Sequence, residues 1–170
     1  MRKGIKAVPG RRLLLFLTGL CFLAVVVMAW ALMQDKGKDS SVFSPPPFDE
    51  NAQQGEPEVP EGLGYSRLDA QEYQVSLCGA PVVRDGNAIL YLTNLASNEV
   101  WLKVRILDED GQMLGESGLL KPGEYVEAVK LSSVPEEDIA VQLKLMAYEP
   151  ETYYSAGAAS LSTTLYAAEK

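Results

Sequence analysis

The sequence predicts an all-β protein, a two-sheet β-sandwich preceded by one N-terminal transmembrane helix. Three observations lead to this fold class. Apolar and polar residues alternate over much of residues 65–170, which is the pattern of strands with one face on a core. Turn residues separate the alternating runs at the short spacing that is typical of sandwiches. Residues 13–33 form a 21-residue run without a single charge.

The uncharged run, Leu13 to Met33, has the length of a membrane span. A helix of this length extends about 31 Å, close to the hydrocarbon thickness of a bilayer. Five basic residues precede the run and no net charge follows it within residues 34–39. By the positive-inside rule, residues 1–12 are then a basic cytoplasmic tail and residues 34–170 are extracytoplasmic. We therefore expect a signal-anchor helix over residues 13–33 whose partner is the lipid bilayer.

The apolar run allows two other interpretations. Ala29-Trp30-Ala31 matches a small-x-small pattern, so the segment is also compatible with a signal peptide cleaved after Ala31. The run is longer than the usual apolar region of about 7–15 residues in a signal peptide, which favours an uncleaved anchor. A lipid anchor on Cys21 is disfavoured because Leu20 precedes it, where a small residue is needed.

Residues 34–64 are predicted to be a disordered linker. They carry a net charge of -5 and contain Pro45-Pro46-Pro47, with further proline, glycine and glutamine. Few side chains in this segment are apolar enough to enter a core. The linker is either a stalk that holds the next domain away from the membrane or a connector whose length is unimportant.

Residues 65–170 are predicted to form one extracytoplasmic β-sandwich domain. Its turn signals include Asp85-Gly86-Asn87, Asp110-Gly111 and Lys121-Pro122-Gly123. The register of residues 124–131 stays open, because two alternating sets of apolar residues compete there. The predicted strands cover residues 71–77, 81–84, 87–93, 99–107, 112–119, 124–131, 139–148 and 158–167.

Part of this domain resembles a known family. Leu90-Tyr91-Leu92-Thr93-Asn94, then Val104 to Gly111, then Leu120-Lys121-Pro122-Gly123-Glu124 is similar to bacterial extracytoplasmic immunoglobulin-like domains of the FxLYD type. The resemblance covers residues 87–131. In the name-giving motif Asp108 matches, while Val104, Ile106 and Leu107 replace the family's Phe, Leu and Tyr. The resemblance implies an immunoglobulin-like sandwich in the cell envelope, and it carries no catalytic residue over.

Composition excludes several classes of function. The chain has no histidine and two cysteines, so it lacks Ser-His and Cys-His nucleophile pairs and the usual zinc ligand sets. A net charge of -8 argues against nucleic-acid binding. We therefore expect no catalytic residue, no metal site and no cofactor.

Three local motifs have simpler interpretations than chemistry. Asp108-Glu109-Asp110-Gly111, with Glu116 nearby, offers carboxylates for calcium, but a solvated hairpin turn is favoured. Gly115-Glu116-Ser117-Gly118 lacks the spacing and the base of a nucleophile elbow. Cys78 is the one thiol outside the apolar run, and we expect it to be buried and inert rather than paired between chains.

Two surfaces are candidates for binding a partner. Trp101 and Arg105 lie on the face of their strand opposite the apolar side chains, so they form either an exposed patch or a face covered by loops or the linker. Tyr153 and Tyr154 lie in a loop before the last strand, where tyrosines suit recognition or pack against the end of the sandwich.

The sequence therefore predicts a membrane-anchored extracytoplasmic module of the bacterial cell envelope. We expect it to be non-catalytic and to bind or assemble with another envelope protein, without contacting nucleic acid. The alternative is an extracytoplasmic sensor domain for a small ligand or cation, and an enzyme comes third.

Overall fold

The structure, a computed structural model, describes residues 44–70 and 72–168, together with isolated helical positions between Leu15 and Met28. Among the described residues, no helix has both the length and the apolar character needed to cross a bilayer. The predicted tail, the predicted anchor helix and residues 34–43 thus lie wholly or mostly outside the described residues. The chain divides into two units, residues 1–44 and Pro45–Lys170, and the second is described below.

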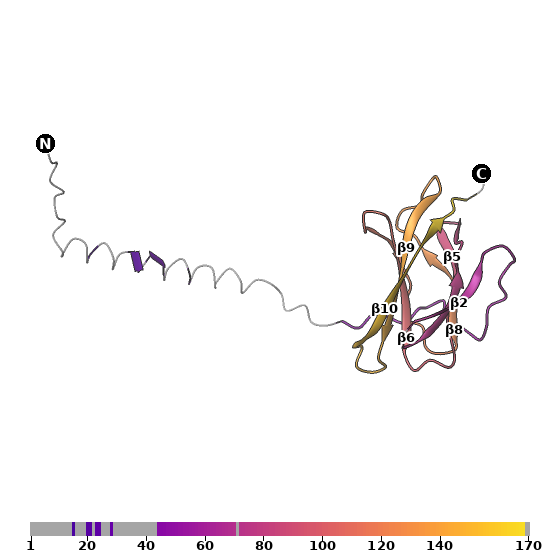
Figure 1. Ribbon diagram of the computed structural model, residues 1–170, viewed down its shortest axis with the longest axis horizontal. Helices are drawn as coiled ribbons and strands as arrows, with labels where there is room; N and C mark the ends of the chain where they lie inside the picture. The colour runs from indigo at the N-terminus through magenta and orange to yellow at the C-terminus, as the bar shows by residue number, and fades with distance from the viewer. Residues whose placement is uncertain are drawn as a thin grey trace. The chain divides into compact units, whose positions relative to one another are not determined.

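The second unit is an all-β fold of two antiparallel sheets (Figure 1). One sheet has the order β1-β8-β5-β3-β2, with β4 also pairing with β5, and the other has the order β10-β9-β6-β7. The strands are β1 (Gln53–Gln54), β2 (Tyr65–Asp69), β3 (Gln74–Cys78), β4 (Val82–Arg84), β5 (Asn87–Asn94), β6 (Trp101–Leu107), β7 (Met113–Glu116), β8 (Glu124–Lys130), β9 (Ile139–Tyr148) and β10 (Ser155–Leu165).

One core lies between the two sheets, and the alternating residues of the sequence supply it. Leu90 and Leu92 of β5 face the same interior as Val104 of β6 and Leu143 of β9, and all four are fully buried. Each predicted strand is present, with ends that differ by a few residues. The prediction of an all-β, two-sheet fold is therefore confirmed, because alternation marks strands that have one face on a core.

Two strands were not predicted. β1 has two residues and β2 has five, and most of their side chains are exposed. Both are edge strands of the larger sheet, pairing on one side only among the described strands. An edge strand with little burial has no need of alternating apolar residues, so its sequence carries no strand pattern.

A bulge explains the open register of residues 124–131. The pairing of β5 with β8 shifts between Ile89 and Leu92, and Tyr91 within that interval has a positive φ of 47°. β5 has one residue more than β8 across this interval. Val126 and Val129 therefore both reach the core, although they are three positions apart and simple alternation would place them on opposite faces. Neither simple alternation along this segment was correct.

The structured unit begins earlier than the sequence predicts. Residues 45–64 belong to the same compact unit as the sandwich, and residues 47–55 and 63–64 form hydrogen bonds with it, so the prediction of a disordered linker over 34–64 does not hold for these residues. Backbone hydrogen bonds rather than apolar side chains hold the segment, which is why its composition resembles a linker. The Asp49 amide donates to the Leu119 carbonyl at 3.0 Å, and the Gly55 amide donates to the Gly123 carbonyl at 2.9 Å.

Candidate functional site: an aromatic surface at the Pro45 end of the sandwich

The segment after Pro45 joins both sheets. At Phe48 it bridges in parallel to Leu119, which in turn is held to β6 through reciprocal hydrogen bonds between Leu102 and Leu120. A few residues later β1 pairs with β8 of the other sheet. The segment therefore closes the open side of the sandwich at the end where the described chain begins (Figure 1).

Two glycines allow close backbone approaches here, Gly118 to the segment after Pro45 and Gly115 to Lys130. A Cβ on Gly118 would overlap the backbone of Phe48 and Asp49, and a Cβ on Gly115 would lie 2.5 Å from the Lys130 carbonyl oxygen. The Gly118 amide also donates to the Asp49 carboxylate at 2.8 Å. Glycine within a strand commonly marks such an approach of one backbone to another. The glycines of residues 115–118 thus serve the fold.

Three aromatic rings meet on the outer side of this junction. The Trp101 ring lies between Phe48, with a centroid distance of 4.8 Å, and Tyr153, with a centroid distance of 5.2 Å, and both contacts are edge-to-face. The Lys121 ammonium lies 4.7 Å from the centroid of the Phe48 ring. Edge-to-face pairs and cation–π contacts each contribute on the order of 1 kcal/mol. We call Phe48, Trp101 and Tyr153 the aromatic cluster.

A tight hairpin between β9 and β10 presents the tyrosines. The Glu149 amide donates to the Tyr154 carbonyl at 2.8 Å, and the Tyr153 amide donates to the Glu149 carbonyl at 3.0 Å. Glu151 and Tyr153 both have a positive backbone φ angle, which residues other than glycine adopt rarely. The neighbouring Tyr154 is 71% exposed. The hairpin thus holds one tyrosine in the aromatic cluster and leaves the next one at the surface.

Trp101 and Arg105 do not form one exposed patch. Trp101 is half-buried under a loop and the segment after Pro45, which is the second of the two arrangements that the sequence left open. Arg105 is four residues further along β6, and its Nε donates to the Glu116 carboxylate at 2.8 Å. The aromatic cluster and Arg105 are therefore separate features of one sheet face.

The Glu116 carboxylate forms ion pairs with two cationic side chains. Its Oε2 lies 2.8 Å from Arg105 Nε and 2.9 Å from the ammonium of Lys103, whose side chain is only 4% exposed. Burial by itself raises the pKa of the Glu116 carboxyl, but the hydrogen bonds from Arg105 and Lys103 outweigh it and lower that pKa below its usual range. The Glu116 carboxylate thus supplies an opposite charge for the buried ammonium of Lys103.

The remaining sequence motifs have structural roles in the described chain. Ser117 is buried, and its hydroxyl accepts from the Val104 amide at 3.0 Å while donating to the Gly118 carbonyl at 2.8 Å. The Asp108 carboxylate accepts from the Gln112 amide at 2.8 Å and so closes a turn. Among the described residues, no group of acidic or sulfur side chains has the arrangement of a metal site.

Cys78 is fully buried, as predicted. It ends β3, opposite Tyr65 of β2. Burial raises the pKa of the Cys78 thiol to about 11. Since the thiolate is the reactive form, this cysteine is chemically protected in the folded domain.

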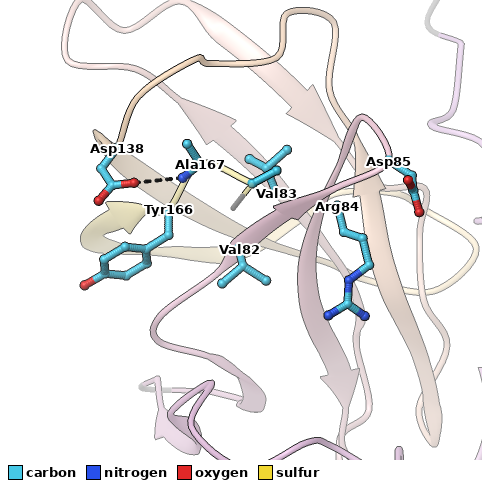
Figure 2. Close-up of a pocket in the computed structure, with 8 residues that line it drawn as sticks. Val82, Val83, Arg84, Asp85, Asp138, Tyr166 and Ala167 are labelled. Carbon is cyan, nitrogen blue, oxygen red and sulfur yellow. Dashed lines mark hydrogen bonds between the residues drawn. The ribbon is translucent and has the colours of Figure 1, made fainter. Parts of the chain in front are cut away.

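A cavity of about 690 Å³ lies at the opposite end of the sandwich. Arg84, Asp85 and Asp138 line it, but Figure 2 shows their charged groups pointing in different directions. Asp138 is already engaged, because its carboxylate accepts from the Ala167 amide at 2.9 Å. The cavity therefore lacks converging polar groups, which specific small-molecule sites usually have.

Comparison with known proteins adds no relative. No family model matches the sequence, and no curated protein matches it. The assignment of the aromatic cluster as a candidate site is therefore based on its geometry alone. Sequence reasoning identified Trp101, Tyr153 and Tyr154 but missed Phe48 and Lys121. The available signal for Phe48 is an aromatic residue directly after three prolines.

Proposed function

We propose that this chain is a non-catalytic binding or assembly module of the bacterial cell envelope. In this proposal residues 13–33 anchor it in the cell membrane, and the β-sandwich lies on the extracytoplasmic side. The charge-free run and its basic N-terminal flank support the anchor and its orientation. The partner is another envelope protein.

The observation that carries the binding role is the tyrosine pair at the tip of the β9–β10 hairpin. Tyr153 is packed on Trp101, while Tyr154 is 71% exposed in a turn held by backbone hydrogen bonds. An exposed aromatic side chain on a rigid support loses little entropy on binding. Tyrosine and tryptophan are also enriched where binding energy concentrates.

We further propose that the sandwich is immunoglobulin-like. Two antiparallel sheets around one core support this assignment, as does a first segment that touches one sheet at Phe48 and the other at β1. Strands that change sheets are typical of sandwich edges. The partial likeness to FxLYD-type domains over residues 87–131 agrees with an envelope location.

The experiment is site-specific photo-crosslinking in living cells. A photoreactive phenylalanine analogue replaces Tyr154 in the full chain, and a matched variant carries it at Val134, which is 50% exposed in the loop before β9. We expect one defined adduct from position 154 and none from position 134. Equal adducts from both positions, or none from either, would contradict a binding site at the Pro45 end.

The same cells test the topology. Protease added to intact protoplasts should digest residues 45–170, since the positive flank lies entirely before the apolar run. Protection of the domain until the cells are lysed would exclude an extracytoplasmic location.

A further inference from the structure

The charges around the exposed tyrosine specify what kind of partner fits. Glu149 and Glu151 lie in the same hairpin as Tyr154, and both are exposed. The hairpin, residues 149–154, contains no basic residue. An exposed aromatic ring that shares a hairpin with two carboxylates attracts a cation, through the ring face and through charge-assisted hydrogen bonds.

The aromatic cluster also binds a cation, here one from the same chain. One of its rings, Phe48, already holds the Lys121 ammonium at 4.7 Å from its centroid. The Tyr154 ring, in contrast, is 71% exposed. The Pro45 end of the sandwich thus contains one cation–aromatic contact within the fold, and an exposed aromatic ring in the same hairpin as two exposed carboxylates.

We propose that the hairpin surface of Tyr154, Glu149 and Glu151 binds an arginine-bearing segment of the partner protein. Arginine fits better than lysine, because its planar guanidinium stacks on an aromatic ring while its N–H groups meet a carboxylate. This inference deepens the proposed binding function and rests on it. A membrane surface is disfavoured as the occupant, since anionic lipid headgroups attract basic segments and the hairpin is acidic.

The position of the surface also limits where the partner segment lies. Eleven residues lie between Met33, the end of the predicted span, and Pro45, and they reach at most about 40 Å. The aromatic cluster begins at Phe48, at the Pro45 end of the sandwich. With the anchor in place, the arginine-bearing segment lies within tens of ångströms of the membrane, as expected for a partner in the same membrane.

The test is a fluorescence titration of the full chain in nanodiscs of zwitterionic phosphatidylcholine. A Trp30→Phe change leaves Trp101 as the one tryptophan, 5.2 Å from the ring of Tyr153. The probes are three blocked pentapeptides, in which glycine alternates with two arginines, two lysines or two glutamates. We expect a saturable change of Trp101 emission with the arginine peptide, a weaker response with lysine and none with glutamate.

Two variants and a charge-matched control locate the site. Tyr154→Ala should weaken binding of the arginine peptide about tenfold, the scale of an interface hot spot. Glu149→Gln with Glu151→Gln should weaken it about fivefold, the scale of two exposed ion pairs. Glu136→Gln with Glu137→Gln removes the same charge at the other end of β9 and should leave binding unchanged.

Three results would overturn the proposal. The first is no saturable response to the arginine peptide. The second is equal weakening by the two double variants, which would indicate attraction to net charge alone. The third is an emission change on adding anionic lipid without peptide, which would identify a membrane surface as the occupant. Protoplast digestion tests the anchored topology independently. If either the peptide titration or the digestion gives a negative result, the other can still be interpreted.

Discussion

At the scale of single residues, the two cysteines differ in their surroundings. Cys78 is fully buried with a pKa of about 11, so at pH 8 only about one thiol in a thousand is ionised. In a Cys21→Ser chain we expect an aromatic disulfide reagent to leave the folded protein unlabelled while it labels the denatured protein at once. Labelling of the folded protein at the denatured rate would place Cys78 at the surface.

Glu116 predicts a specific pH dependence of stability. Its pKa is lowered in the folded state, so the carboxylate stabilises the fold above its unfolded pKa of about 4.5. That contribution disappears as the pH falls through the folded pKa. Glu116→Gln should therefore cost about 1 kcal/mol at pH 7, because the carboxylate is partly exposed, and much less at pH 3.

Urea unfolding of the two proteins at both pH values measures this difference. Glu124→Gln is the matched control, since Glu124 is a partly buried strand residue whose carboxylate accepts from the Gln54 side-chain amide and the Lys121 backbone amide, both uncharged donors. An equal cost at pH 7 and pH 3 would show that the ion pairs with Lys103 and Arg105 contribute nothing.

At the scale of elements, the segment after Pro45 is the part of the fold that the sequence concealed. Its hydrogen bonds to Gly118, Leu119 and Gly123 each contribute on the order of 1 kcal/mol. A fragment of residues 45–170 should therefore be more stable than one of residues 65–170 by a few kcal/mol in urea unfolding. Equal stability of the two fragments would show that the segment is a linker after all.

Gly118 provides the matching point mutation. Gly118→Ala adds a methyl group that overlaps the backbone of Phe48 and Asp49, which should cost about 1–3 kcal/mol in the longer fragment. In the shorter fragment, which lacks that backbone, the same change should cost much less. Gly115→Ala is the control, because its added Cβ would lie 2.5 Å from the Lys130 carbonyl oxygen, which both fragments contain, so its cost should be the same in both. A cost independent of residues 45–64 would contradict the packing described here.

The contrast between predicted and unpredicted elements has a physical basis. Strands such as β6 and β9 bury one face, so their apolar residues alternate and the sequence reveals them. β1, β2 and the segment at Phe48 are held by backbone hydrogen bonds at sheet edges, which any residue can make. The partner of Asp49 is Gly118, 69 residues away, and no local pattern signals a contact of that range.

The residues of the candidate site likewise divide into those that the sequence predicts and those that it does not. Tyr153 and Tyr154 were predicted because a tyrosine-rich loop is visible in the sequence. Arg105 was grouped with Trp101 because they share a strand face, but its pairing with Glu116 depends on the neighbouring strand. Whether an outward aromatic residue is exposed depends on what crosses over it, and here that is the unpredicted segment with Phe48.

At the scale of the whole molecule, the chain combines a predicted membrane anchor, a short connection and one sandwich whose two ends differ. The Pro45 end carries the aromatic cluster and the acidic hairpin. The other end has a cavity without converging charged groups. A sensor of small ligands would bind its ligand in the cavity, whereas an assembly module would bind its partner at the Pro45 end. The central claim is therefore that Tyr154 serves binding and not folding.

One paired measurement on the full chain tests this claim most directly. With the photoreactive analogue at Glu151, the yield of partner adduct in cells and the thermal midpoint of the purified protein are recorded with and without Tyr154→Ala. Because the Tyr154 side chain is 71% exposed, the account predicts loss of the adduct with an unchanged midpoint. An undiminished adduct, or a midpoint that falls together with it, would contradict the account.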